Sequence, residues 1–360
     1  MSDSSFNPQS VDLDTADPRD IICYLNAGGN EYDGRLGARV SALFVILIVS
    51  TATTFFPVVA TRVRRLRVPL YVYLFARYFG AGVIIATAFI HLLDPAYDEI
   101  GPASCIGMTG GWAEYTWPPA LALTSAMIIF LLDFIAEYYV EMRYGMAHVD
   151  VEDTVTGTHQ DLHSHDQDAQ QRKSNSASVD EFDELKVLEN DSEKAANSFR
   201  SQIAAFLILE FGVLFHSVII GLNLGVVGDE FKTLYPVLVF HQSFEGLGIG
   251  ARLSVIPFPR GLRWMPWALC LAYGLTTPIA IAIGLGLRTT YNSGSFTANV
   301  VSGVLDSISA GILIYTGFVE MLARDFLYNP QRTNDKKRLA FMLGSLYLGT
   351  GIMALLGKWA

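Results

Sequence analysis

The chain has 360 residues, of which 51% are hydrophobic and 17% are charged, and its formal net charge at pH 7 is −10. A soluble globular protein carries about 25% charged residues, so the composition excludes an ordinary soluble protein. The acidic residues gather in two polar stretches, 1–36 and 141–200, and the rest of the chain is slightly basic. The net charge therefore gives no reason to expect a nucleic-acid partner.

Uncharged runs in the sequence predict an all-α, polytopic membrane protein. About 20 apolar residues cross a bilayer as one helix, and the runs 40–61, 264–287 and 339–357 have about that length. Five further segments are long enough but contain ionisable residues, whose side chains a helix can turn inward. We predict eight spans, with seven as the alternative, at about 40–62, 70–93, 118–140, 201–227, 233–252, 264–287, 298–320 and 339–357.

The distribution of lysine and arginine predicts how the spans are oriented. Cytosolic loops collect these residues, and most of those outside the spans follow odd-numbered spans. The other side holds only six of them: Arg19, Arg35, Arg39, Lys232, Arg288 and Lys358. Both termini are therefore expected outside the cytosol.

The same reading divides the chain into four regions. An acidic extracytosolic tail (1–36) precedes transmembrane helices 1–3 (37–140), and a cytosolic loop (141–200) precedes helices 4–8 (201–360). The loop is rich in Ser, Asp and Gln and poor in aromatic residues, a composition that predicts disorder.

Two of the three cysteines fall on the predicted extracytosolic side. A disulfide between Cys23 and Cys105 is permitted there, and two unpaired thiols are the equally weighted alternative. Cys270 lies within the sixth predicted span. The sequence contains no CxxC motif, so metal binding by thiolates is unsupported.

Three histidines lie inside predicted spans. In the motif HQSFEG, His241 and Glu245 are one helical turn apart, so both project from one face with Gln242 beside them. His216 lies in the fourth span, and His91 lies near the outer end of the second. Each histidine alone could be a polar group hydrogen-bonded between helices. Because ionisable residues are costly in a membrane and usually mark a pathway, we predict that these side chains share one site.

Other acidic residues of the spans are weaker candidates for the pathway. Asp133 and Glu137 lie one turn apart near the cytosolic end of the third span, where they could line an exit or bond to basic loops. Glu210 could support the metal site or be purely structural. The remaining members of this group are Asp306 and Glu320.

The motifs of the fourth and fifth spans resemble those of the ZIP (Zrt/Irt-like) divalent-metal transporters. The segments that carry the resemblance are HSVIIGLNLG, HQSFEG, ATAFIHLLDPA in the second span, and the short end GKWA. The resemblance extends over about residues 36–360 and points to the fungal branch of plasma-membrane zinc transporters. It implies eight helices in an inverted 3+2+3 arrangement, with helices 4 and 5 between the two repeats.

The resemblance also implies a metal site between helices 4 and 5. Neutral imidazoles and a carboxylate suit zinc, and protonation of these groups would oppose metal binding. We expect His91 nearer the external entrance than the other ligands. Some branches carry a glutamate where this chain has Ile220, so one principal ion is expected. The site residues are His216, His241 and Glu245, flanked by Gln242 and Ser217.

The leading hypothesis is an alternating-access carrier that imports zinc into the cytosol, with iron or another divalent metal as open alternatives. Zinc would be the transported substrate, no cofactor is expected, and the chain would not be an enzyme. Its partners would be the metal ion, the lipid bilayer and, as an open case, a second copy of the chain in a homodimer.

Two other functions compete with a carrier. An intramembrane zinc hydrolase would also gather histidines among helices, but HQSFEG is not HExxH and no general base is evident. A metal-sensing receptor would use the cytosolic loop as its output.

The predicted cytosolic loop carries the peptide HQDLHSHD at residues 159–166. His159, His163 and His165 could reach one zinc ion in a flexible chain, although ordering the chain would limit the affinity. One interpretation is a cytosolic zinc receiver that regulates the carrier. The other is an acidic linker that happens to contain histidines.

Overall fold

The computed structural model describes residues 9–12, 14–26, 32–63, 69–144, 180–290, 292, 294–328 and 332–359. This part of the chain contains helices and no β-strand, which confirms the predicted all-α class. It forms two compact units, residues 131–204 and the larger unit of residues 1–130 and 205–360.

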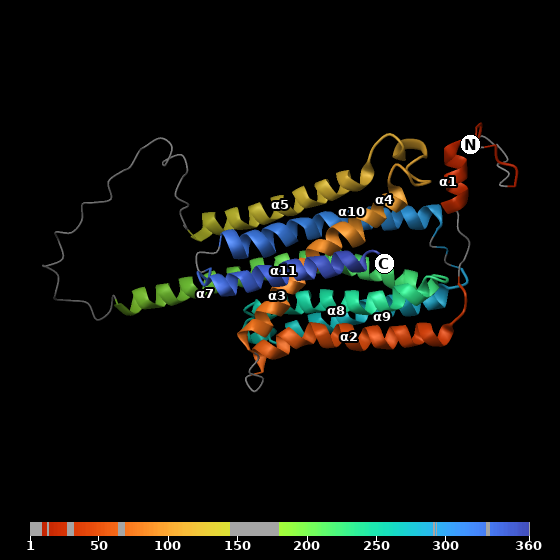
Figure 1. The fold of residues 1–360 in the computed structure, drawn as a ribbon. Helices are drawn as coiled ribbons and strands as arrows, with labels where there is room; N and C mark the ends of the chain where they lie inside the picture. Colours follow the sequence, from red (N-terminus) through yellow and green to blue (C-terminus); the bar gives the residue numbers. More distant parts are fainter. Residues whose placement is uncertain are drawn as a thin grey trace. The chain divides into compact units, whose positions relative to one another are not determined.

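Most of the described residues lie in helices (Figure 1). A short helix, α1 (Pro18–Asn26), precedes the membrane body, and two 3-10 turns, η2 (Gly110–Trp112) and η3 (Arg260–Leu262), lie in loops. The other helices are α2 (Leu36–Arg62), α3 (Leu70–Ala86), α4 (Asp94–Ile100), α5 (Trp117–Tyr144), α7 (Asp180–Val226), α8 (Phe231–Val255), α9 (Met265–Leu287), α10 (Phe296–Tyr315) and α11 (Lys336–Leu356).

Two π-helical segments continue helices of the larger unit. The segment η1 (Thr87–Leu93) joins α3 to α4 without a break, and η4 (Thr316–Leu327) continues α10. The second and seventh helical segments therefore end at residues 100 and 327, beyond the predicted ends at 93 and 320. π-Helical turns often occur at functional sites, and η1 contains His91.

Seven helical segments among the described residues are long and apolar enough to cross a membrane. They correspond to every predicted span except the fifth, which is α8. This helix has 25 residues, or about 37 Å at 1.5 Å per residue, so its length is sufficient. It is less apolar than the others because it carries Lys232, His241, Gln242, Glu245 and Arg252.

The helix α7 begins at Asp180, well before residue 201, where the fourth span was predicted to start. The end of the segment that we expected to be a disordered loop is therefore helical. Its sequence, DEFDELKVLENDSEKAANSF, is rich in Glu, Lys, Leu and Ala, which favour helices. Composition alone did not separate this polar helix from a polar linker.

Close helix crossings enclose α8, which packs against both α2 and α3 (Figure 1). The backbones of Gly80 in α3 and Gly248 in α8 leave no room for a Cβ on either residue. Gly250 of α8 meets the Thr54 carbonyl of α2 in the same way. Small residues at crossings let membrane helices approach this closely. The central face of α8 therefore points toward the interior of the protein.

The helices α7 and α9 also cross closely. Gly221 packs against the Thr277 carbonyl, and Gly225 packs against the backbone of Gly284. A hydrophobic cluster fills the space between α2, α7, α8 and α9, and its fully buried members include Ile46, Leu224 and Ile281. These contacts fix α7 and α9 on the sides of α8.

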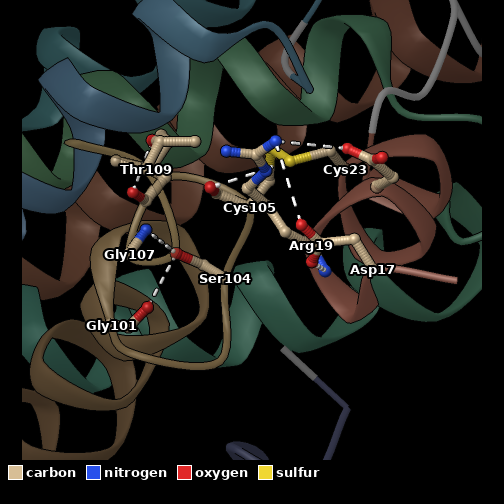
Figure 2. The surroundings of a disulfide bond; sticks show 10 residues. Asp17, Arg19, Cys23, Gly101, Ser104, Cys105, Gly107 and Thr109 are labelled. Atoms are coloured by element: carbon tan, nitrogen blue, oxygen red, sulfur yellow. Dashed lines mark hydrogen bonds and ion pairs between the residues drawn. A yellow bond between two sulfur atoms is a disulfide. The ribbon is translucent and has the colours of Figure 1, made fainter. Parts of the chain in front are cut away.

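A disulfide joins Cys23 of α1 to Cys105 in the loop after α4 (Figure 2). Of the two alternatives left open by the sequence, the structure therefore has the bridge. The Ser104 hydroxyl orders this loop, because it donates to the Gly101 carbonyl at 2.8 Å and accepts from the Gly107 N–H at 2.9 Å. The bridge holds the N-terminal tail to the end of the second helical segment.

Arg39, near the start of α2, is completely buried. Its guanidinium donates to the Leu224 carbonyl at 2.9 Å and to the Val227 carbonyl at the end of α7. It also pairs with Asp33 at 2.8 Å. The last carbonyls of a helix lack partners within the helix, so Arg39 ties the end of α7 to the start of α2.

Candidate metal site

The enclosed face of α8 carries three polar side chains from the HQSFEG motif. His241, Gln242 and Glu245 are 2%, 1% and 0% exposed. The tight crossings at Gly248 and Gly250 follow directly on the same helix. They hold the motif against the neighbouring helices, so the shared face predicted from the spacing points into the protein.

Histidines from two other segments meet His241. The centroid of its ring lies 4.8 Å from that of His91 in η1 and 5.4 Å from that of His216 in α7. Both partners are buried, and Ser217 next to His216 is fully buried as well. The structure therefore brings together three histidines that lie on three separate predicted spans.

His91 lies beside His241, as a shared site requires: it is only 6% exposed and its ring contacts that of His241. Its position nearer the external entrance stays a prediction. Its Nε2 atom lies 3.2 Å from the carbonyl oxygen of Met353 in α11. His91 lies within the π-helical segment η1, which no pattern in the sequence predicts.

Tyr273 of α9 belongs to the same group, and sequence reasoning missed it. Its hydroxyl oxygen lies 2.9 Å from Gln242 Oε1 and 3.1 Å from Glu245 Oε2. A tyrosine in an apolar helix is usually a core residue with its hydroxyl satisfied locally. The sequence indicates only that the hydroxyl of a buried Tyr needs a hydrogen-bond partner. The packing of α9 on α8 determines which residue that partner is.

Many buried polar atoms of this group have no hydrogen-bond partner. They are His216 Nδ1 and Nε2, Ser217 Oγ, His241 Nε2, Gln242 Nε2 and Glu245 Oε1. His241 Nε2 lies 3.8 Å from Glu245 Oε2, which is too long for a hydrogen bond. Buried polar atoms are nearly always satisfied in proteins. Imidazole and carboxylate atoms left unpaired in one place are the donor set that a cation such as zinc would satisfy.

The ligand candidates are close to one another but do not converge on one point. Within the part of the chain that the structure describes, no three His, Cys, Asp or Glu side chains are arranged to hold a metal ion together. Zinc ligand atoms lie about 2.0–2.2 Å from the ion, whereas the rings of His91 and His241 meet edge to face at 78°. Binding would require rotation of these side chains.

The weaker candidates have different surroundings, and some of them are not among the described residues. Glu320 of η4 pairs with Arg324 at 2.9 Å and with Arg252 at 3.5 Å. Asp306 of α10 is buried, and its Oδ1 atom has no hydrogen-bond partner. Glu210 of α7 is 9% exposed with Oε2 unpaired, and Asp133 belongs to the smaller unit. Neither the side chain of Glu137 nor the loop residues His159, His163 and His165 are among the described parts.

Comparison with known proteins agrees with the motifs. A family model described as ZIP zinc transporter matches residues 36–357. Zinc-regulated transporter 1 of Saccharomyces cerevisiae is 57% identical over 99% of this chain and 97% of its own length. Zinc-regulated transporter 1 of Schizosaccharomyces pombe is 41% identical, covering 92% of this chain and 87% of its own length.

A third relative is Zinc-regulated transporter 2 of Saccharomyces cerevisiae, which is 35% identical over 97% of this chain and 100% of its own length. No solved structure matches the chain. The family match covers almost the whole membrane body and contains every helix that contributes to the candidate site. The chain belongs to the ZIP zinc transporter family, whose members are multi-pass membrane transporters and not enzymes.

Proposed function

We propose that this chain is a carrier that imports zinc into the cytosol through the site between α7 and α8. Membership of the ZIP family and the names of the fungal relatives support zinc as the substrate. One observation carries the location of the site: the unpaired buried imidazole and carboxylate atoms around His241. They need a partner that the protein does not provide.

In this proposal His216, His241 and Glu245 bind the ion, and Ser217 and Gln242 flank it. Two neutral imidazoles and one carboxylate favour zinc, but ligand type alone separates zinc poorly from iron and other divalent metals. Iron therefore stays a second candidate substrate. The position that could add a bridging carboxylate is Ile220, so we propose one principal ion.

His91 joins this set in the proposal because its ring lies against His241. It can act as a further ligand after rotation, or hold the His241 ring in place while the other residues bind. The side chains must turn to converge on an ion, and that movement suits a carrier, which has to bind and release its substrate. Alternating access of this site to the two sides is part of the proposal.

We also propose eight spans in an inverted 3+2+3 arrangement in the plasma membrane, with α8 as the fifth span and both termini outside the cytosol. The bridge between Cys23 and Cys105 supports this topology, because it needs the tail and the loop after the second span on the same side. Disulfides persist outside the cytosol. A homodimer stays a prediction.

Reconstitution tests the function directly. Purified protein in liposomes that enclose a zinc-sensitive dye should give saturable zinc flux, and Glu245→Gln should abolish it. Tyr235→Phe is a matched control, since this residue packs in the hydrophobic cluster of α8 away from the site. Tight stoichiometric zinc binding without flux would contradict a carrier and favour a sensor. Competition by other ions in the same assay compares iron with zinc as a substrate.

Cysteine labelling tests the topology. The native cysteines give little background, because two are bridged and Cys270 is buried. A cysteine introduced at Ser4 should react with an impermeant reagent on intact cells, and one at Ser174 should not. The reverse pattern would invert the orientation and contradict import.

A further inference from the structure

The hydroxyl of Tyr273 faces three acceptors and has one proton, and the most distant acceptor is the backbone carbonyl of Gln242 at 3.4 Å. The hydroxyl oxygen lies 2.9 Å from Gln242 Oε1 and 3.1 Å from Glu245 Oε2. When Glu245 binds zinc, as the proposed function requires, it is ionised. An ionised carboxylate is the stronger acceptor, so the proton of Tyr273 then goes to Glu245. The Tyr273 oxygen then meets the Gln242 oxygen without a proton between them, which leaves two buried lone pairs in contact.

A half-turn of the Gln242 amide removes this conflict. The oxygen and nitrogen of a glutamine amide are nearly the same size, so a half-turn exchanges them within the same space. The Gln242 NH2 group then donates to the Tyr273 oxygen, and the Tyr273 hydroxyl donates to Glu245. The change also removes an unsatisfied donor, since Gln242 Nε2 otherwise has no partner.

The half-turn also changes what Gln242 presents to the metal site. Its oxygen takes the position of the Nε2 atom, which is buried and has no hydrogen-bond partner, as is also true of His241 Nε2 and Glu245 Oε1. An amide oxygen carries lone pairs and can bind a cation, whereas an amide NH2 is a donor only. With the opposite orientation Gln242 would repel the ion.

We propose that Tyr273 is a positioning residue that orients Gln242 and Glu245 for the ion. The Tyr273 hydroxyl thereby orients the Glu245 carboxylate and the Gln242 amide so that each presents an oxygen atom to the ion. Tyr273 itself does not contact the metal. This inference rests on the proposed function, because it assigns Tyr273 a task at the same site. Because Tyr273 lies on α9, the packing of α9 on α8 determines the geometry of the ligands.

The variant Tyr273→Phe tests the role, because it removes one oxygen and keeps the ring. A lost hydrogen bond to a charged group should raise the KM for zinc in liposomes about tenfold. The maximal rate per folded protein should stay within about twofold of wild type, because a hydroxyl that only orients ligands acts on binding. Tyr235→Phe on α8, which removes a hydroxyl outside the site, should leave both parameters unchanged.

A double variant shows whether Tyr273 acts through Gln242. If it does, Tyr273→Phe should raise the KM by only about threefold or less in a Gln242→Ala background, because coupled residues are non-additive. The full tenfold effect in that background would overturn the link to Gln242. An unchanged KM in the single variant, or a lower maximal rate with unchanged KM, would overturn the positioning role.

The wild-type protein separates this inference from the proposed function. If the wild-type protein transports zinc and Tyr273→Phe has the same KM and maximal rate, only the positioning role is contradicted. If wild type neither moves zinc in liposomes nor binds it at equilibrium in detergent, the proposed function fails and the inference fails with it.

Discussion

Two groups of polar side chains each include residues of α8, and they differ in how their charges are paired. The first is the proposed metal site around His241 and Glu245. The second, the arginine–carboxylate cluster, consists of Arg77, Arg252, Glu320, Arg324 and Asp325. Each charge of this cluster has an opposite charge within 3.5 Å, and Arg77 bonds both oxygens of Asp325 at 2.8 and 2.7 Å.

The metal site has no such internal neutralisation. Glu245 is completely buried, and its Oε2 atom lies 3.8 Å from His241 Nε2. Among the described residues, no Lys or Arg pairs with Glu245. Glu245 and Arg252 are seven residues apart on α8, or about 10 Å along the helix. The helix α8 therefore contributes Arg252 to a group whose charges are paired, and His241 and Glu245 to a group that a cation would complete. We take this difference as the physical signature of a binding site.

The largest expected effect comes from removing the only carboxylate of the metal site. Glu245→Gln keeps the shape of the side chain and the bond to Tyr273 but loses the negative charge. Loss of a metal ligand should lower zinc uptake by at least about a hundredfold. Uptake is measured with radioactive zinc in cells whose surface expression is matched. Near-normal uptake at normal expression would remove Glu245 from the site.

His91→Ala should have the next largest effect. Its ring contacts His241 and its Nε2 atom lies against the Met353 carbonyl, so its loss frees the His241 ring to move. We expect about a tenfold rise in the KM for zinc, as for residues that support metal ligands. A KM equal to that of wild type would mean that His91 is a structural group that happens to touch the site.

Breaking the arginine–carboxylate cluster should act on stability instead of zinc affinity. Glu320→Gln leaves Arg252, whose side chain is only 14% exposed, without its partner and should cost on the order of 3 kcal/mol. The melting temperature in detergent should fall, while the KM for zinc stays within about twofold. In Arg252→Met/Glu320→Leu no buried charge is orphaned, so this variant should melt higher than the single one. A large rise in KM without a change in melting would place Glu320 on the path of the ion.

The loop histidines should have the smallest effect on initial uptake. Replacing His159, His163 and His165 by alanine removes no residue of either buried group. Initial uptake should stay almost intact, while the variant should persist longer at the cell surface, or keep transporting, when cytosolic zinc is high. Loss of initial uptake would place the loop on the transport path. An unchanged response to excess zinc would leave it a linker.

The sequence predicted which buried polar side chains lie together better than it predicted their surroundings, for physical reasons. The spacing of His241 and Glu245 places both on one face of any α-helix, and the cost of polar groups in a membrane indicates that such a face points inward. The π-helical turn that holds His91 could not be predicted, because no pattern in the sequence indicates it. Tyr273 was missed because its partner is chosen by packing between helices.

The same distinction applies to the fold. Seven helices are apolar enough to be predicted as spans, whereas α8 is less apolar because it carries the polar side chains of the candidate site. Composition predicts a disordered loop for the polar start of α7, because its charged residues suit both a helix and a linker. Short-range patterns therefore predict the helices themselves, while tertiary packing decides the ends of helices and the partners of polar side chains.

The central claim is that the unpaired atoms around His241 bind the transported zinc. The most direct test is the X-ray absorption spectrum of one equivalent of zinc bound to a variant whose four loop histidines, His148, His159, His163 and His165, are alanine. Of the 7 histidines of the chain, only His91, His216 and His241 then remain. We expect scattering from about two imidazoles, with zinc–nitrogen distances of about 2.0–2.1 Å. Zinc bound by oxygen alone, with transport intact, would contradict it.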